Sequence, residues 1–194
     1  MLRNICLLVA SLSAMSVQAG GWVSEPDNAE GFWANLHGLC GQAFAGTLVH
    51  EPGESMTGKR LLMHVRECGD ERIRIPFVVG DNLSRTWVLS RQGERMELRH
   101  DHRGEDGQPE GVTMYGGVSP NPGSAFGQIF PTDEQSQQVL PDSWPSVWLM
   151  SIDPDRQTFT YYARRQATDS YYHVEFDLSE AVEPPPAPWG WDAG

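Results

Sequence analysis

The sequence predicts an all-β domain with one short N-terminal helix, folded as an antiparallel up-and-down barrel of about 8–10 strands. Two observations lead to this prediction. Apolar and polar residues alternate with a period of two through most of residues 61–182, which is typical of strands with one buried face. Turn signals such as Gly69-Asp70, Gly80-Asp81 and Gln92-Gly93 interrupt the alternation about every 10–12 residues. This spacing favours sequential hairpins, and a two-sheet β-sandwich is the alternative.

Residues 1–19 have the pattern of a signal peptide. Arg3 provides the positive start, and residues 5–17 are mostly apolar. Val17 and Ala19 place small residues at the two positions that matter for cleavage. We expect cleavage after Ala19 and a periplasmic or secreted mature protein. The apolar run is short and interrupted by serines, so we expect no membrane span there or later in the chain.

The first mature element is a predicted helix from Ala29 to Leu39. Asp27 or Asn28 can cap its N-terminus, and Gly41 is suited to its end. The apolar residues of one face recur at helical spacing: Phe32, Leu36, Leu39 and Cys40.

Two cysteines, Cys40 and Cys68, are left after the signal is removed. An even number of cysteines in an oxidising compartment favours a disulfide. The chain has no Cys-x-x-Cys motif, which argues against a reactive thiol pair. We therefore predict a structural bridge that holds the helix to the body of the domain.

Strands are expected from Leu61 to Cys68, where the meander begins, and then at 72–79, 86–90 and 95–103. Pro76 cannot donate to a strand ladder, so it requires a sheet edge or a bulge. Further strands are expected at 112–118, 124–130, 146–152, 158–163 and 171–178. A short helix is expected from Thr132 to Val139, because Thr132 and Gln135 have the spacing of a capping box.

Residues 20–182 therefore form one predicted β-rich domain, followed by a tail rich in proline and tryptophan at 183–194. Three consecutive prolines in the tail favour polyproline II. We expect the tail to end the fold, with Trp189 and Trp191 either laid on the barrel or loose. The functional alternative is a tail that docks into an aromatic groove of a partner protein.

A candidate metal site lies at His100-Asp101-His102. On a strand, the two histidines share a face with Met96 and Leu98, and the charged residues share the other face. Two imidazoles on one face can bind a divalent transition metal when a third ligand joins them.

Glu105, Asp106 and His64 are the candidates for this third ligand. The spacing differs from the cupin pattern, because only two residues separate His102 from Glu105. No cupin chemistry is therefore inferred. The other interpretations are histidines that hydrogen-bond near a barrel rim and a histidine general base.

Aromatic residues on the predicted inner faces are the candidate ligand-binding residues. They are Phe77, Trp87, Tyr161, Tyr172 and Phe176. In a small barrel such residues either line a cavity for an apolar ligand or fill a solid core.

The charge balance restricts the class of partner. The chain has 26 acidic and 14 basic residues, a net charge of −12. This balance argues against nucleic acid and anionic membranes as partners. The sequence also lacks a Gly-x-Ser-x-Gly motif and a phosphate-binding glycine loop.

A short helix followed by a meander of many strands, in an exported chain, resembles the calycin group of lipocalin-like barrels. Gly20-Gly21-Trp22 matches the lipocalin Gly-x-Trp motif. This resemblance implies an architecture and transfers no ligand-binding residue. The segments "GLCGQAFAG", "SRTWVLSR" and "PPAPWGW" resemble those of uncharacterised exported proteins of Gram-negative bacteria. This resemblance implies an exported location and no particular activity.

Three functions follow from these observations. The first is a barrel that binds a small apolar ligand or an envelope protein, with no cofactor and no catalysis. The second is a metal-dependent enzyme that uses His100 and His102. The third is a structural accessory protein of the cell envelope, without a pocket, that acts through its tail or its acidic surface.

Overall fold

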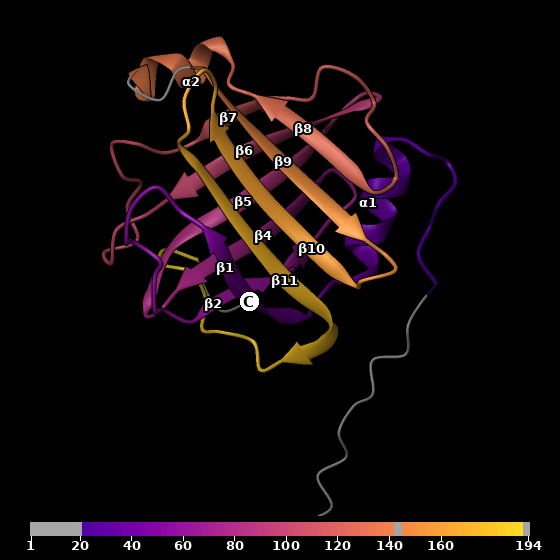
Figure 1. Cartoon of the computed structure of the whole chain (residues 1–194), viewed down its shortest axis with the longest axis horizontal. Helices are drawn as coiled ribbons and strands as arrows, with labels where there is room; N and C mark the ends of the chain where they lie inside the picture. The colour runs from indigo at the N-terminus through magenta and orange to yellow at the C-terminus, as the bar shows by residue number, and fades with distance from the viewer. Residues whose placement is uncertain (1–20, 142–144, 192–194) are drawn as a thin grey trace, which may run out of the picture.

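The computed structural model describes residues 21–141 and 145–191, so the predicted signal peptide lies outside the described residues. The described chain is mostly strand, and its antiparallel sheet closes almost completely into a barrel (Figure 1). The predicted fold class is confirmed. Neither described helix has the length and apolar character needed to cross a membrane.

The elements follow one another as a meander. They are α1 (Ala29–Gly38), β1 (Ala43–His50), β2 (Leu61–His64), β3 (Glu67–Cys68), β4 (Arg72–Val79), β5 (Asn82–Gln92), β6 (Arg95–His102), β7 (Tyr115–Val118), β8 (Gly127–Pro131), α2 (Glu134–Val139), β9 (Ser146–Asp153), β10 (Thr158–Arg165) and β11 (Tyr171–Val182). The sheet order is β7-β6-β5-β4-β2-β1-β11-β10-β9-β8, and β3 also pairs with β4. The antiparallel pairing of β1 with β11 joins the two halves of the meander.

The seam between β7 and β8 is closed by α2. The Ser136 hydroxyl accepts a hydrogen bond from the Gly116 N–H (2.6 Å) and donates one to the Gly116 carbonyl (2.9 Å). The Asp133 N–H donates to the same carbonyl at 3.0 Å. Gly117 allows the close approach, because a Cβ there would lie 1.8 Å from the Pro131 carbonyl oxygen. Side-chain and loop bonds therefore take the place of a strand ladder at this seam.

Helix α1 covers one end of the barrel (Figure 1). The Asn28 side chain caps it by accepting a hydrogen bond from the Glu30 N–H. Phe32 and Leu36 are fully buried and join the barrel core. Glu30 forms an ion pair with Arg91 near the C-terminal end of β5, which identifies the end of the barrel that α1 covers.

The predicted disulfide is present. Cys40, two residues beyond α1, is bonded to Cys68 in β3, with a Cα–Cα distance of 6.1 Å. The bridge therefore fastens the segment that follows the helix to the sheet.

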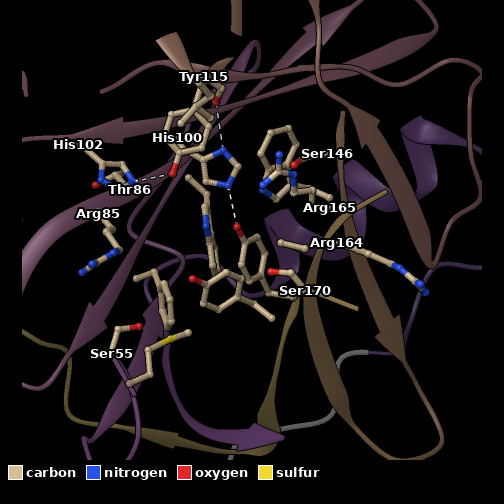
Figure 2. Close-up of a pocket in the computed structure, with 18 residues that line it drawn as sticks. Ser55, Arg85, Thr86, His100, His102, Tyr115, Ser146, Arg164, Arg165 and Ser170 are labelled. Carbon is tan, nitrogen blue, oxygen red and sulfur yellow. Dashed lines mark hydrogen bonds between the residues drawn. The ribbon is translucent and has the colours of Figure 1, made fainter. Parts of the chain in front are cut away.

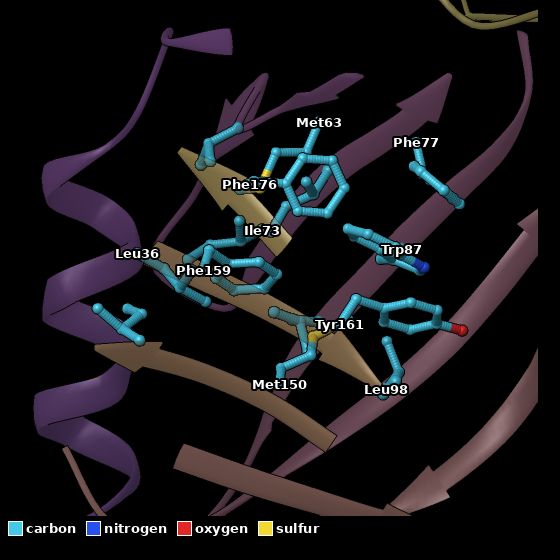
Figure 3. Packing of buried hydrophobic residues seen from close by; sticks show 14 of the residues in the cluster. Leu36, Met63, Ile73, Phe77, Trp87, Leu98, Met150, Phe159, Tyr161 and Phe176 are labelled. Atoms are coloured by element: carbon cyan, nitrogen blue, oxygen red, sulfur yellow. The ribbon is translucent and has the colours of Figure 1, made fainter. Parts of the chain in front are cut away.

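The hydrophobic core extends from α1 through the barrel as far as the rings of Phe77, Trp87 and Tyr161 (Figure 3). Its largest fully buried side chains come from the helix and from strands on all sides: Trp87, Phe32, Phe44, Phe130, Phe159 and Phe176. Apolar residues that alternate along each strand supply it, which is the pattern that the sequence predicted for the inner faces.

Strand β1 was not expected from the sequence, which predicted that the meander begins at Leu61. Ala43, Ala45 and Gly46 give this strand little apolar contrast. The small residues have a packing reason, since a Cβ at Gly46 would lie 2.7 Å from the ring of Phe176. The strand that joins the two halves of the meander is therefore one of the least visible in the sequence.

Pro76 lies inside β4, between β5 and the strands β2 and β3. Strand β2 pairs with residues 77–79 of β4, and β3 pairs with residues 73–74. Pro76 stands opposite the interruption between them, where its missing N–H costs no ladder bond. The sequence predicted a sheet edge or a bulge at Pro76. The structure instead has a break between β2 and β3 on the side of β4 that does not pair with β5.

Several predicted boundaries were wrong. Helix α2 is capped by Asp133, whose side chain accepts from the Ser136 N–H at 2.8 Å. Thr132, the expected cap, instead donates to the Ser146 carbonyl at 2.7 Å. The strands expected at 112–118 and 124–130 are Tyr115–Val118 and Gly127–Pro131, so each begins three residues later than predicted.

The described part of the C-terminal tail lies on the outside of the barrel. The Trp189 N–H donates to the Leu83 carbonyl at 3.3 Å. The Trp191 ring lies under the guanidinium groups of Arg74 (4.2 Å) and Arg103 (5.2 Å). These contacts correspond to the interpretation that the tail covers the barrel, and its docking to a partner stays a prediction.

Candidate functional site

A cavity of about 400 Å³ lies in the barrel at the end opposite α1 (Figure 2). It is formed where β4, β6 and β10 end and where β5, β7, β9 and β11 begin. The barrel interior is therefore solid next to the helix and hollow at the other end. The two sequence interpretations, a cavity and a solid core, each describe one half of the molecule.

Aromatic rings form the walls of this cavity. Trp87 stacks on Tyr161 with ring centroids 4.5 Å apart, and Phe77 stacks on Trp87 at 5.0 Å. Tyr172, partly exposed, lines the rim. Four of the five predicted ligand-binding residues thus line the cavity. The fifth, Phe176, is fully buried beneath it, with its edge against Phe77 and Trp87.

His100 lies at the floor of the cavity and is held at both ring nitrogens. Nδ1 lies 3.1 Å from the Tyr115 carbonyl oxygen, and Nε2 lies 2.8 Å from the Tyr161 hydroxyl. A carbonyl oxygen only accepts, so Nδ1 carries the proton and Nε2 accepts from Tyr161. Burial lowers the pKa of His100 to about 3, so this tautomer is neutral at neutral pH.

His102 forms a second histidine–tyrosine pair nearer the rim. Its Nε2 lies 3.1 Å from the Tyr115 hydroxyl, and its Nδ1 lies 3.9 Å from a Glu110 carboxylate oxygen. Burial, and next the positive charge of Arg85, lower the pKa of His102 to about 4. Figure 2 shows both histidines beside Tyr115.

The tyrosines stay protonated for the same physical reason. Burial raises the pKa of Tyr115 to about 12 and raises that of Tyr161 well above its ordinary value. At neutral pH, two neutral imidazoles and two neutral phenols therefore make up the polar part of the floor.

The candidate metal ligands do not gather in this arrangement. Within residues 21–141 and 145–191, no three His, Cys, Asp or Glu side chains lie together as a metal ion would require. His64 ends β2 beside Ala43, at the helix end of the barrel. Glu105 and Asp106 lie in the loop after β6 and do not line the cavity. The divalent-metal site at His100 and His102 stays a prediction.

Sequence reasoning missed several of the lining residues. Tyr115 and Trp148 lie against His100, with ring centroids 4.7 and 5.0 Å from its own. Arg85, Arg164 and Arg165 also line the cavity. Strand parity could have found two of them, because Arg85 shares a face of β5 with Trp87, and Arg165 shares a face of β10 with Tyr161.

Comparison of the chain with protein-family models, with curated proteins and with solved structures gives no match. The site is therefore interpreted from its own geometry.

Proposed function

We propose that the protein is an exported binding module that holds a small molecule in the open half of its barrel. The observation that carries the proposal is the cavity of about 400 Å³ above a solid core. Binding sites for small molecules typically have volumes of about 300–1,000 Å³ and mostly aromatic or aliphatic walls. The neutral, fully hydrogen-bonded floor favours binding over chemistry, because each nitrogen of His100 already has a partner.

Two further features support the export and the binding role. A disulfide between Cys40 and Cys68 is expected of a chain that matures in an oxidising compartment. An up-and-down barrel with one end covered by a helix is compatible with the resemblance to lipocalin-like barrels.

Binding can be measured with N-phenyl-1-naphthylamine, an uncharged aromatic probe that fluoresces in apolar surroundings. We expect saturable binding by the mature protein. Ala163→Phe places a ring in the cavity and should weaken binding at least about tenfold, since the added ring occupies the volume that the probe needs. Thr160→Phe adds the same ring on the outer face of β10 and should leave binding unchanged.

Circular dichroism keeps this comparison interpretable, and Ala163→Leu replaces the larger substitution if the Phe variant unfolds. A folded wild-type protein that binds no probe would contradict the proposal, as would equal affinities of the wild type and a folded Ala163 variant. Export is tested separately by sequencing the N-terminus of protein recovered from the periplasm or the medium. Gly20 is expected there, and an intact Met1 would reject the signal peptide.

A further inference from the structure

We propose that the ligand of this cavity is an amphipathic organic anion, with its apolar body against the aromatic walls and its carboxylate or similar acidic group held by Arg85 and Arg165 at the rim. This inference rests on the proposed function and specifies the chemical class of the molecule that is bound.

Arg85 is the first reason. It is half-buried near the start of β5, paired across the sheet with Phe77 on one side and His102 on the other. Its Nη1 donates to the Asn82 side-chain oxygen at 3.0 Å. Among the described residues, no carboxylate lies within ion-pair distance of its guanidinium. Most of its N–H donors are therefore available to a ligand.

The charge of Arg85 also reaches into the cavity. After burial, Arg85 is the largest influence on the pKa of His102 and of Tyr115, and it lowers both. The positive charge of Arg85 thus opposes a protonated His102 and stabilises an ionised Tyr115. By the same attraction it would stabilise an anionic group of a ligand at these positions.

Arg165 supplies a second guanidinium at the end of β10. It shares the inner face of this strand with Tyr161 and Ala163, and Figure 2 shows it beside Ser146. Its neighbour Arg164 also lines the cavity, although Figure 2 shows its side chain extending outward, and its Nη2 donates to the Thr168 carbonyl at 3.2 Å. Arg156 lies in the turn before β10, at the other end of the barrel, does not line the cavity and provides a control.

The rest of the lining contributes no opposing charge. The chain has nearly two acidic residues for each basic one, yet none of the described lining residues is acidic. The nearest carboxylate identified at the rim is Glu110, which is partly exposed and lies 3.9 Å from His102 Nδ1. A cationic ligand would meet the guanidinium groups of Arg85 and Arg165 and no lining carboxylate, whereas an anion would form charge-assisted hydrogen bonds.

A matched pair of probes separates this inference from the proposed function. 8-Anilinonaphthalene-1-sulfonate carries the same rings as N-phenyl-1-naphthylamine with one sulfonate added. We expect the wild-type protein to bind the sulfonate at least about tenfold more tightly, because hydrogen bonds to charged groups are worth about this factor or more. The preference should shrink as sodium chloride is raised from 0.05 to 0.5 M, since the arginines lie at the rim.

Variants then assign the effect to residues. Arg85→Gln and Arg165→Gln should each lower the affinity for the sulfonate by about tenfold and leave that for the neutral probe unchanged, which also shows that the variants are folded. Arg156→Gln removes the same charge at the other end of the barrel and should change neither affinity. Glu110→Gln should raise the affinity for the sulfonate by about twofold, because it removes a partly exposed negative charge.

The two failures are distinguishable. If the neutral probe binds in the cavity but the sulfonate binds no more tightly, or if Arg156→Gln lowers sulfonate binding as much as Arg85→Gln, the anion inference is wrong and the binding function stands. If neither probe binds, both proposals fail.

Discussion

The hydroxyl of Tyr161 donates a 2.8 Å hydrogen bond to Nε2 of His100, and so connects β10 to β6 through the interior of the barrel. The two strands are not neighbours in the sheet, and both groups are almost completely buried. The bond places a polar contact between the solid core and the cavity, and it gives Nε2 of His100 a donor once the Tyr115 carbonyl has fixed the proton on Nδ1.

Tyr161→Phe should lower the free energy of unfolding by about 1–3 kcal/mol, because it leaves the buried Nε2 of His100 without a donor. Tyr162→Phe removes a hydroxyl from the outer face of the same strand and should cost less than about 0.5 kcal/mol. Urea unfolding at pH 7 measures both. If both variants lost the same free energy of unfolding, the hydrogen bond between Tyr161 and His100 would not stabilise the fold.

Stability should fall as the pH is lowered from 6.5 to 5. His100 and His102 have folded-state pKa values of about 3 and about 4, below the ordinary value of 6.5. Between these values the unfolded chain binds protons that the folded protein does not, so the stabilisation is complete above pH 6.5 and is lost on acidification. Each histidine contributes a slope of about 1.4 kcal/mol per pH unit in this window.

Urea midpoints at pH 7.0, 6.0 and 5.0 measure this slope, and the range stays above the region where most carboxylates titrate. His102→Gln should reduce the slope by about 1.4 kcal/mol per pH unit, which is the contribution of one histidine. A wild-type midpoint that is constant over the range would mean that the two imidazoles are not kept neutral by burial.

Ser136→Ala should weaken the seam between β7 and β8. It removes both hydrogen bonds to Gly116 and leaves a buried N–H without its acceptor, at a cost of about 1–3 kcal/mol. Amide hydrogen exchange should also accelerate in β7 and β8 more than in β4 and β5. Gln138→Ala, on the exposed side of α2, is the matched control, and a seam that exchanges equally in both variants would contradict this role of Ser136.

Replacing both Cys40 and Cys68 by serine should lower the free energy of unfolding by about 3–4 kcal/mol, as expected for a disulfide that closes a loop of this length. Thermal unfolding of the variant and of the oxidised protein measures the difference. If the oxidised protein and the variant melt at the same temperature, the bridge does not stabilise the fold.

The sequence predicted the elements whose inner faces are strongly apolar. Strands β4, β5 and β6 follow from residues such as Ile75, Trp87 and Leu98, which alternate with polar neighbours. Strand β1 could not be found in this way, because Gly46 is small in order to accommodate the ring of Phe176, a contact between residues far apart in the chain. The cap of α2 was missed for a similar reason, since Thr132 forms its bonds with Ser146 of β9.

The candidate site was predicted only in part. The alternation located Trp87, Tyr161 and the two histidines on inner faces, but it does not show which end of a strand faces a core and which faces a cavity. Arg85 was overlooked because a charged residue near the end of a strand usually belongs to the solvent. Arg85 lines the cavity because the end of the barrel where β5 begins is open. That end is open because α1 covers the other one.

The pairing of β1 with β11 has a consequence for the order of folding. The partner of Ala43–His50 is made of residues 171–182, so the barrel cannot close until β11 is available. Hairpins such as β4–β5 and β5–β6 can form as soon as their own strands exist, whereas closure waits for the last strand. The two halves of the barrel therefore stay unjoined until β11 has been synthesised, although Cys40 and Cys68 both lie in the part of the chain that is made before β4.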